Sequence, residues 1–247
     1  MTKTVKQLII INVSLFVLIN LFRQFAWSRW FGLVPSLVFA EFRIWQLATY
    51  MFLHVGLWHL VVNMLMLWFF GPAVETAWGW AEFLRFYFFT GIGAGLCSFI
   101  TAFHSPVPVI GASGAIFGIL VAYALMYPET VILLFFIFPM KIRQAVFVLA
   151  GINLLGALSE PSAGIAYFAH LGGGLFGYLY LRSEWIKRQL SYWRKPNLVR
   201  KKTQQKKTDE KNLDRQVDLI LDKVSREGLE SLSSKERKIL ELKSKKS

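Results

Sequence analysis

The sequence predicts an all-α polytopic membrane protein with six membrane-spanning helices. Of its 247 residues, 55% are hydrophobic, and the mean hydropathy is +0.44. This is more apolar surface than one soluble core of that length can bury. Six apolar runs each suit a span of ~20 residues, and they fall at 7–24, 50–71, 82–103, 109–127, 142–159 and 164–183.

The first run follows Lys3 and Lys6, which is the layout of either a signal peptide or a first span. No small-x-small cleavage site comes after it, because Phe25-Ala26-Trp27 is bulky. We therefore expect a retained span. Residues 23–50 are rich in aromatic side chains, which favour the headgroup region of a bilayer, and we expect a structured outer loop there.

The segment 129–158 contains an apolar octet, Val131–Phe138, between Pro128 and Pro139. Eight residues are too few to cross a bilayer. We expect this octet to form an interfacial hairpin, with the fifth span beginning near Lys141 and Arg143.

The charge of the chain is concentrated at its carboxyl end. Residues 1–181 carry 8 of the 28 Lys and Arg and 5 of the 15 acids, and residues 182–247 carry the other 20 and 10. Basic residues after a last span are typical of cytoplasmic orientation, and they can also touch anionic lipid. We prefer this interpretation to nucleic-acid binding. Six spans then place both termini in the cytoplasm.

Composition predicts three regions, at 1–193, 194–211 and 212–247. The first is the membrane bundle, and the second is a basic polar linker. In the third, apolar residues recur at helical spacing from Leu213 to Val224. Gly228 then ends one helix, and Ser233 with Glu236 forms a capping-box pattern that starts another. We expect a small cytoplasmic helical hairpin, for which the sequence identifies no partner.

Two polar side chains in apolar segments point to chemistry. Ser113 lies in Gly111-Ala112-Ser113-Gly114 near the start of the fourth span, and His170 lies near the start of the sixth. Ionisable groups inside a membrane are functional candidates. At about 1.5 Å per helical residue, both lie within roughly 10 Å of the outer surface. We expect a serine nucleophile with a histidine base.

Other residues fit the remaining needs of amide hydrolysis. His59 and Asn63 share one face of the second span and are expected to donate hydrogen bonds to the oxyanion. Gly111 and Gly114 allow close approach at the serine. No Asp occurs before Asp209, so the imidazole needs orientation by packing, for which Phe117, one turn below Ser113, is suitable.

Further residues are expected to support the site. We expect Gly173 and Gly177 to let the sixth span press against the fourth, and His54 to serve as a structural hydrogen-bonding residue. Cys97, the single cysteine, excludes a disulfide framework and is expected to be a packing residue.

Other functions fit parts of the same pattern. The small residues around Ser113 alone would suit a helix-packing face, but a matching histidine favours catalysis. A metal site of His54, His59 and His170 lacks a nearby carboxylate and a His-Glu-x-x-His motif. An aspartyl protease is excluded by the missing Asp. A non-catalytic protein that binds transmembrane helices is the remaining alternative.

The chain resembles the rhomboid family of intramembrane serine proteases over nearly all of residues 7–183. The matching motifs are Gly111-Ala112-Ser113-Gly114, Ala166-x-x-x-His170-x-x-Gly173-x-x-x-Gly177 and His54-x-x-x-x-His59-x-x-x-Asn63. The resemblance implies a six-helix bundle that cleaves transmembrane substrates through a Ser113–His170 dyad. It also implies that His59 and Asn63 lie at the oxyanion.

The sequence departs from the family pattern in two places. Trp45-Gln46 stands where many members have Trp-Arg in the first loop, with Arg43 just upstream, and Phe117 stands where some have tyrosine. Neither departure changes Ser113 or His170. We expect a cofactor-free endopeptidase without a metal, located in the bacterial inner membrane. Its partners are expected to be single-pass membrane proteins, cleaved near the outer face, and the lipid bilayer.

Overall fold

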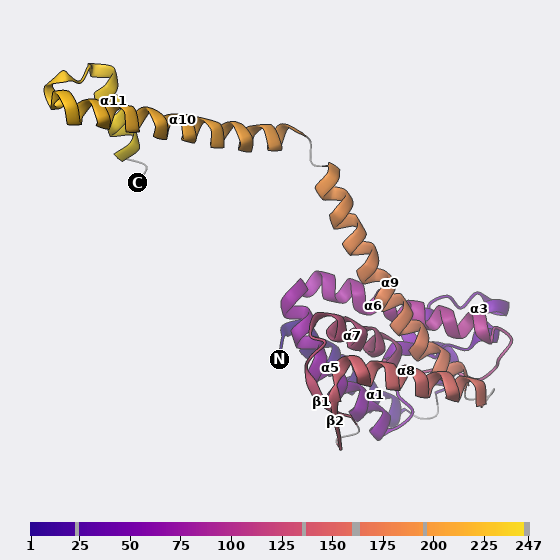
Figure 1. Ribbon diagram of the computed structural model, residues 1–247. Helices are drawn as coiled ribbons and strands as arrows, with labels where there is room; N and C mark the ends of the chain where they lie inside the picture. Colours follow the sequence, from indigo (N-terminus) through magenta and orange to yellow (C-terminus); the bar gives the residue numbers. More distant parts are fainter. Residues whose placement is uncertain (23–24, 135–136, 160–163, 195–196, 245–247) are drawn as a thin grey trace. The chain divides into compact units, whose positions relative to one another are not determined.

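The computed structural model describes residues 1–22, 25–134, 137–159, 164–194 and 197–244. The chain forms two compact units, Met1–Trp185 and Ile186–Ser247, which are described separately. The elements of the first unit (Figure 1) are α1 (Lys3–Leu21), α2 (Trp27–Phe31), α3 (Pro35–Glu41), α4 (Gln46–Thr49), η1 (Tyr50–Phe52), α5 (Leu57–Trp78), α6 (Trp80–Thr101), α7 (Ser113–Met126), β1 (Val131–Leu134), β2 (Phe138–Lys141), α8 (Ile142–Ser159) and α9 (Gly164–Arg194), which extends beyond it.

Among the described residues, four helices are long and apolar enough to cross a membrane, namely α1, α5, α6 and α8. The chain is therefore a mostly helical integral membrane protein. Helix α7 is apolar but has only 14 residues. It begins at Ser113 and not at 109, because Gly111 has a φ of 127°, which is outside the helical region. Six spans remain a prediction.

Helix α5 runs from Leu57 to Trp78, several residues later than the predicted span at 50–71. The preceding Tyr50–Phe52 forms a 3-10 turn, and the extended Gly56 caps α5. The helix continues through Pro72, although proline cannot donate the usual backbone hydrogen bond. Membrane helices tolerate such interruptions because neighbouring groups satisfy the freed carbonyl.

The aromatic loop after α1 is structured, as predicted, and contains α2, α3, α4 and η1. Gln46 lies at its centre: the side-chain oxygen accepts from the N–H of Val34 at 2.9 Å, and the nitrogen donates to the carbonyl of Arg29 at 2.8 Å. The Arg43 guanidinium lies 4.4 Å from the ring centre of Trp30. The Trp45-Gln46 departure therefore leaves this loop internally bonded.

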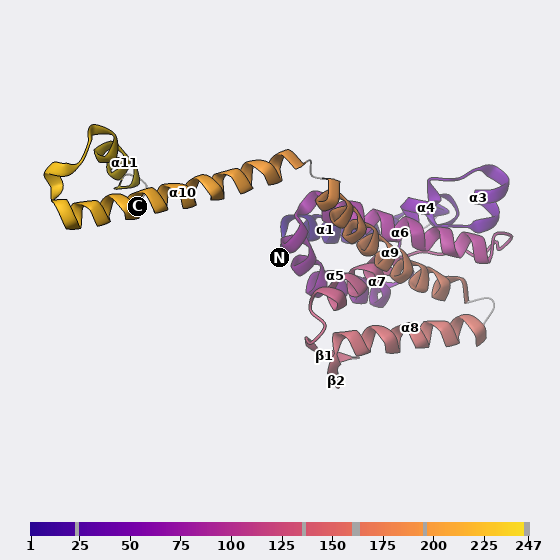
Figure 2. The same cartoon turned by 45° about the horizontal axis from the view of Figure 1, so that its top comes forward.

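The predicted hairpin is present between α7 and α8. Strands β1 and β2 pair antiparallel, with Val131 opposite Lys141 and Leu134 opposite Phe138. Glu129 accepts from Lys141 at 2.5 Å and forms an ion pair with Arg143 at 3.0 Å. The hairpin leads directly into α8 (Figure 2). This ion-pair cluster holds the base of the hairpin at the start of that helix.

Helix α7 occupies the centre of the first unit, where it contacts α5, α6 and α8 (Figure 1). Nine of its 14 residues are buried, including Ala115, Ile119, Leu120 and Ala122. A helix that is apolar on every side is suited to such a position. The first residue of α7, Ser113, is therefore held by packing along the whole helix.

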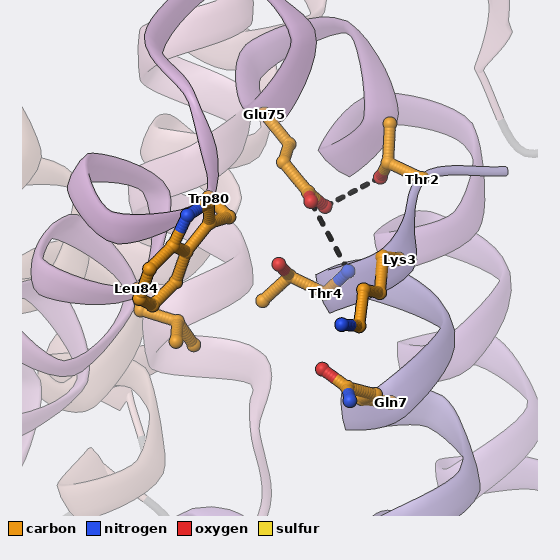
Figure 3. Close-up of a pocket in the computed structure, with 7 residues that line it drawn as sticks. All are labelled: Thr2, Lys3, Thr4, Gln7, Glu75, Trp80 and Leu84. Carbon is orange, nitrogen blue, oxygen red and sulfur yellow. Dashed lines mark hydrogen bonds between the residues drawn. The ribbon is translucent and has the colours of Figure 1, made fainter.

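A carboxylate on α5 caps the amino end of α1. Glu75 accepts from the backbone N–H groups of Thr4 and Val5 at 3.1 and 3.0 Å, and from the Thr2 hydroxyl. Helix amino termini have N–H groups without intrahelical partners, and negative charge is favourable there. Figure 3 shows this contact beside a pocket of about 500 Å³ that Trp80 also lines. Glu75 thereby fastens α1 to α5.

The second unit contains α10 (Asn197–Glu227), η2 (Leu229–Ser231) and α11 (Ser234–Ser244). The predicted hairpin is present: Gly228 has a φ of 83°, and Glu236 accepts from the N–H of Ser233 at 2.7 Å. The first helix, however, begins at Asn197 instead of near 212. From residue 197 the predicted linker is helical, because its Lys, Gln and Glu residues favour helix without an apolar face.

Candidate functional site

Ser113 is the first residue of α7 and lies two residues after Gly111, which has a positive φ of 127°. Gly111 turns the chain, and its N–H donates to the carbonyl of Tyr50 at 2.9 Å. The first intrahelical bond runs from Ile116 to the carbonyl of Ala112. The N–H groups of residues 113–115 consequently lack intrahelical acceptors. The serine hydroxyl thus lies beside a set of backbone donors.

His170, on α9, is the immediate neighbour of Ser113. Its Nε2 lies 2.7 Å from the Ser113 Oγ. The ring of Phe117 is nearly parallel to the imidazole, at 8°, with 6.2 Å between ring centres. This brings together the predicted nucleophile, base and packing residue on two helices. The distance is suitable for proton transfer between the hydroxyl and the imidazole.

A residue that we did not predict, Asn153 on α8, contacts the other side of the imidazole. Its Oδ1 lies 2.6 Å from the Nδ1 of His170. The Asn153 side chain is buried, and its Nδ2 donates to the carbonyl of Leu149 at 2.7 Å. The signal available in the sequence was an amide within the apolar run 142–159, a feature that more often marks contact between helices.

His59 and Asn63 lie on α5 near the serine turn. A Cβ added to Gly111 would meet the His59 ring at 2.7 Å and the Ser113 Oγ at 3.7 Å. The ring of His59 therefore lies against Gly111, two residues before Ser113. The buried Asn63 donates from Nδ2 to the carbonyl of His59 at 2.7 Å. The second N–H of this amide remains available for another acceptor.

His54 is buried beside His59, with 5.1 Å between ring centres. We expected it to make a structural hydrogen bond. Within the described part of the chain, neither of its ring nitrogens has a hydrogen-bond partner. Its ring and that of His59 form a T-shaped pair. No three His, Cys, Asp or Glu side chains among the described residues are arranged to hold a metal ion.

Glycines bring the backbones of α7 and α9 into contact. A Cβ on Gly173 would lie 1.9 Å from the carbonyl oxygen of Gly114, and one on Gly177 would lie 3.0 Å from the Cα of Gly118. Gly114 itself leaves no room for a side chain, because Ala94 of α6 is 2.5 Å from its Cβ position. This spacing holds His170 within reach of Ser113.

Two family models match the chain. A Rhomboid domain matches residues 41–185, and a family of unknown function (DUF6576) matches residues 200–246. The first match contains Ser113, His170, Asn153, His59 and Asn63. The second covers most of α10 and all of α11 up to residue 244.

Similar proteins occur in fungi, bacteria and plants. Rhomboid protein 1, mitochondrial, of Saccharomyces cerevisiae is 35% identical over 140 residues, which are 52% of this chain and 38% of the relative. Rhomboid protease GluP of Bacillus subtilis is 43% identical over 90 residues, 36% of this chain and 17% of the relative. RHOMBOID-like protein 1 of Arabidopsis thaliana is 31% identical over 170 residues, 66% and 40% of the two chains. The matched part of this chain spans less than half the length of each relative.

Proposed function

The chain belongs to the rhomboid family, and on this premise we propose that it is an intramembrane serine endopeptidase with Ser113 as nucleophile and His170 as general base. The observation that carries the proposal is the 2.7 Å distance between the His170 Nε2 and the Ser113 Oγ. A hydroxyl becomes a good nucleophile when an adjacent base takes its proton.

The proton transfers and the bond changes involve these two side chains, the substrate and water. His170 removes the Ser113 proton, and the oxygen attacks a substrate carbonyl to form a tetrahedral intermediate. The intermediate collapses as His170 gives that proton to the leaving amine, which leaves an acyl-enzyme on Ser113. Water, deprotonated by His170, then attacks the ester carbonyl, and the proton returns to Ser113 as the acid product leaves.

The oxyanion has several donors within this arrangement. We propose His59 and Asn63 together with the free N–H groups at the start of α7. Preorganised donors are effective here because they need no reorientation as negative charge develops on the substrate oxygen. Gly111 and Gly114 do not leave open space for a substrate, because the His59 ring lies 2.7 Å from the Cβ position of Gly111 and Ala94 lies 2.5 Å from that of Gly114; instead they let α5 and α6 pack closely around Ser113.

The substrates we propose are single-pass membrane proteins. A carbonyl inside a helix is already hydrogen-bonded and sterically covered, so the segment has to unwind before Ser113 can attack. We place the site near the outer face of a bacterial plasma membrane, with both termini in the cytoplasm, on the distribution of Lys and Arg in the sequence.

The decisive experiment compares the purified wild-type protein with Ser113→Ala and His170→Ala on a generic transmembrane substrate in detergent. We expect both variants to lose cleavage, and a fluorophosphonate probe to label the wild type but not Ser113→Ala. The double variant should be no worse than either single one, because the two residues act as a unit. Folded wild-type protein that binds the substrate without cleaving it would support the alternative, a non-catalytic binder of transmembrane helices.

A further inference from the structure

We propose that Asn153 is a positioning residue that holds His170 in the tautomer needed to activate Ser113. This inference rests on the proposed function. In many serine hydrolases a carboxylate orients the histidine, but no Asp occurs before residue 209 of this chain, and the Nδ1 of His170 contacts an amide oxygen. The Asn153 Oδ1 is 2.6 Å from the Nδ1 of His170, which is the place such a carboxylate would take.

The orientation of the Asn153 amide is determined by a backbone group of its own helix. The carbonyl of Leu149 is 2.7 Å from Nδ2, and a carbonyl oxygen can only accept a hydrogen bond. The nitrogen of the amide must therefore point to Leu149. The oxygen, which can only accept, must then point to His170. The burial of Asn153, which is 7% exposed, limits competition from water for these bonds.

The oxygen of Asn153 in turn determines which imidazole nitrogen carries the proton. An acceptor at 2.6 Å requires Nδ1 to donate. In neutral imidazole the other nitrogen then has a lone pair and no proton. That nitrogen, Nε2, is the one that faces the Ser113 hydroxyl. The alternative tautomer would oppose two lone pairs at Asn153 and would leave Ser113 facing an N–H.

These bonds run without interruption across three helices. They lead from Leu149 and Asn153 on α8, through His170 on α9, to Ser113 on α7. The stacked Phe117 restricts the plane of the imidazole, but an apolar ring cannot select a tautomer. Phe117 thus restricts the plane of the ring, and the hydrogen bond to Asn153 selects the tautomer.

Asn12 on α1 provides a matched control. Its Nδ2 donates to the carbonyl of Leu8 at 2.8 Å, four residues earlier, as Asn153 does to Leu149. Both amides are buried, with Asn12 0% and Asn153 7% exposed, but Asn12 Oδ1 has no hydrogen-bond partner within the described residues. Asn12→Ala therefore measures the cost of removing a self-bonded amide, and Asn153→Ala removes the bond to His170 as well.

The test reads the tautomer directly. Nitrogen-15 NMR of histidine-labelled protein in detergent distinguishes protonated from unprotonated ring nitrogens, and the signals of His170 are those lost in His170→Ala. We expect Nδ1 of His170 to be protonated in the wild type and in Asn12→Ala. In Asn153→Ala, we expect a mixture of both tautomers. A wild-type His170 protonated mainly at Nε2 would overturn the inference.

Activity provides a second readout on the same preparations. We expect Asn153→Ala to lower kcat by at least ~10-fold, as part of the ~10² to 10⁴ that a positioned base contributes, with KM little changed. Asn153→Asp restores an acceptor and should recover most of the lost turnover. Asn12→Ala should cleave at the wild-type rate.

The inference and the proposed function fail in different ways. A wild type that does not cleave, yet protonates His170 at Nδ1 only when Asn153 is present, would overturn the protease and support the positioning role. An active wild type whose rate and tautomer are both unchanged in Asn153→Ala would overturn the positioning role and support the protease. If Asn153→Ala does not fold, Asn153→Asp and the wild-type spectrum still decide.

Discussion

The contacts of Asn63, His59 and His104 indicate different roles for these three polar residues. Asn63 uses one N–H on the carbonyl of His59, so one donor remains for a substrate oxygen. His59 itself packs against Gly111. His104, by contrast, contacts the rings of Phe39 and Phe103. We therefore expect His59, but not His104, to contribute to turnover.

His59→Ala should lower kcat by ~10² or more, equivalent to about 3 kcal/mol, because an oxyanion donor acts mainly in the transition state. KM should change little. The measurement is steady-state cleavage together with a melting curve on the same preparation. His104→Ala is the matched control, expected to keep both values. A melting temperature that falls in proportion to the lost activity would instead indicate a structural role for His59.

The residue-level pattern was only partly predictable from sequence. Ser113 and His170 were conspicuous because polar groups are costly in apolar segments, and Phe117 followed from helical spacing. Asn153 was not, because an amide in a span usually bonds to its own helix or to a neighbour. The contact of Asn153 with His170 depends on how α8 packs beside α9, which a local sequence pattern does not indicate.

At the scale of elements, helix identity was easier to predict than helix ends. Long apolar runs indicate a helix but do not specify its first residue. Gly111 determines the start of α7 through its backbone conformation, and Gly56 does so for α5. The polar residues before 212 predict a linker, because a helix without an apolar stripe shows no helical periodicity of hydrophobic residues.

The contact between α7 and α9 predicts a large effect from a single methyl group. Gly173→Ala should destabilise the bundle by about 1–3 kcal/mol or more, since overpacking is costly and the opposing atom is the Gly114 carbonyl oxygen. Cleavage should fall as well. Gly151→Ala on α8 is the control, because no atom lies within 4 Å of its Cβ position. There, replacing a helical glycine should be neutral or stabilising. Equal melting temperatures for both variants would contradict this contact.

The capping box of the second unit predicts a dependence on pH. Hydrogen bonds from Ser233, aided by Lys223, lower the pKa of Glu236 from 4.5 to about 2. A carboxyl whose pKa is lowered by folding stabilises the folded state above pH 4.5. That stabilisation is lost as the pH falls from 4.5 through about 2.

Amide hydrogen exchange of residues 233–244 tests this in the full-length protein. At each pH the wild type is compared with Glu236→Gln, which cannot ionise, so the intrinsic exchange rate cancels. We expect greater protection of the wild type above pH 4.5 and a ratio that declines toward one as the pH approaches 2. A constant ratio across this range would show that the ionised carboxylate contributes nothing to α11.

At the scale of the whole molecule, the two units differ in character. The first, Met1–Trp185, holds every residue assigned here to chemistry and matches the Rhomboid domain. The second is highly charged and matches a separate family over residues 200–246. We keep the prediction that the membrane bundle is sufficient for peptide-bond cleavage.

A chain that ends at Lys195 should therefore cleave a generic transmembrane substrate in detergent at close to the wild-type rate. The full-length protein, purified in parallel, is the comparison, and circular dichroism reports whether the shortened chain is folded. In cells, the shortened chain can differ from the full-length protein in substrate choice or abundance without contradicting this prediction. A folded but inactive shortened chain would mean that the second unit supports the catalytic bundle.

The loop between α1 and α5 meets the segment before Ser113 through main-chain atoms. Leu33 and Val109 exchange backbone hydrogen bonds at 2.9 and 2.8 Å, and Gly111 bonds to the carbonyl of Tyr50. Main-chain contacts are indifferent to which side chains the residues carry. The backbone bonds at Leu33, Val109 and Gly111 would therefore remain if their side chains changed, whereas the loop around Gln46 is held by the side-chain amide. The position of the segment before Ser113 thus depends on the path of the loop backbone more than on the side chains of Leu33 and Val109.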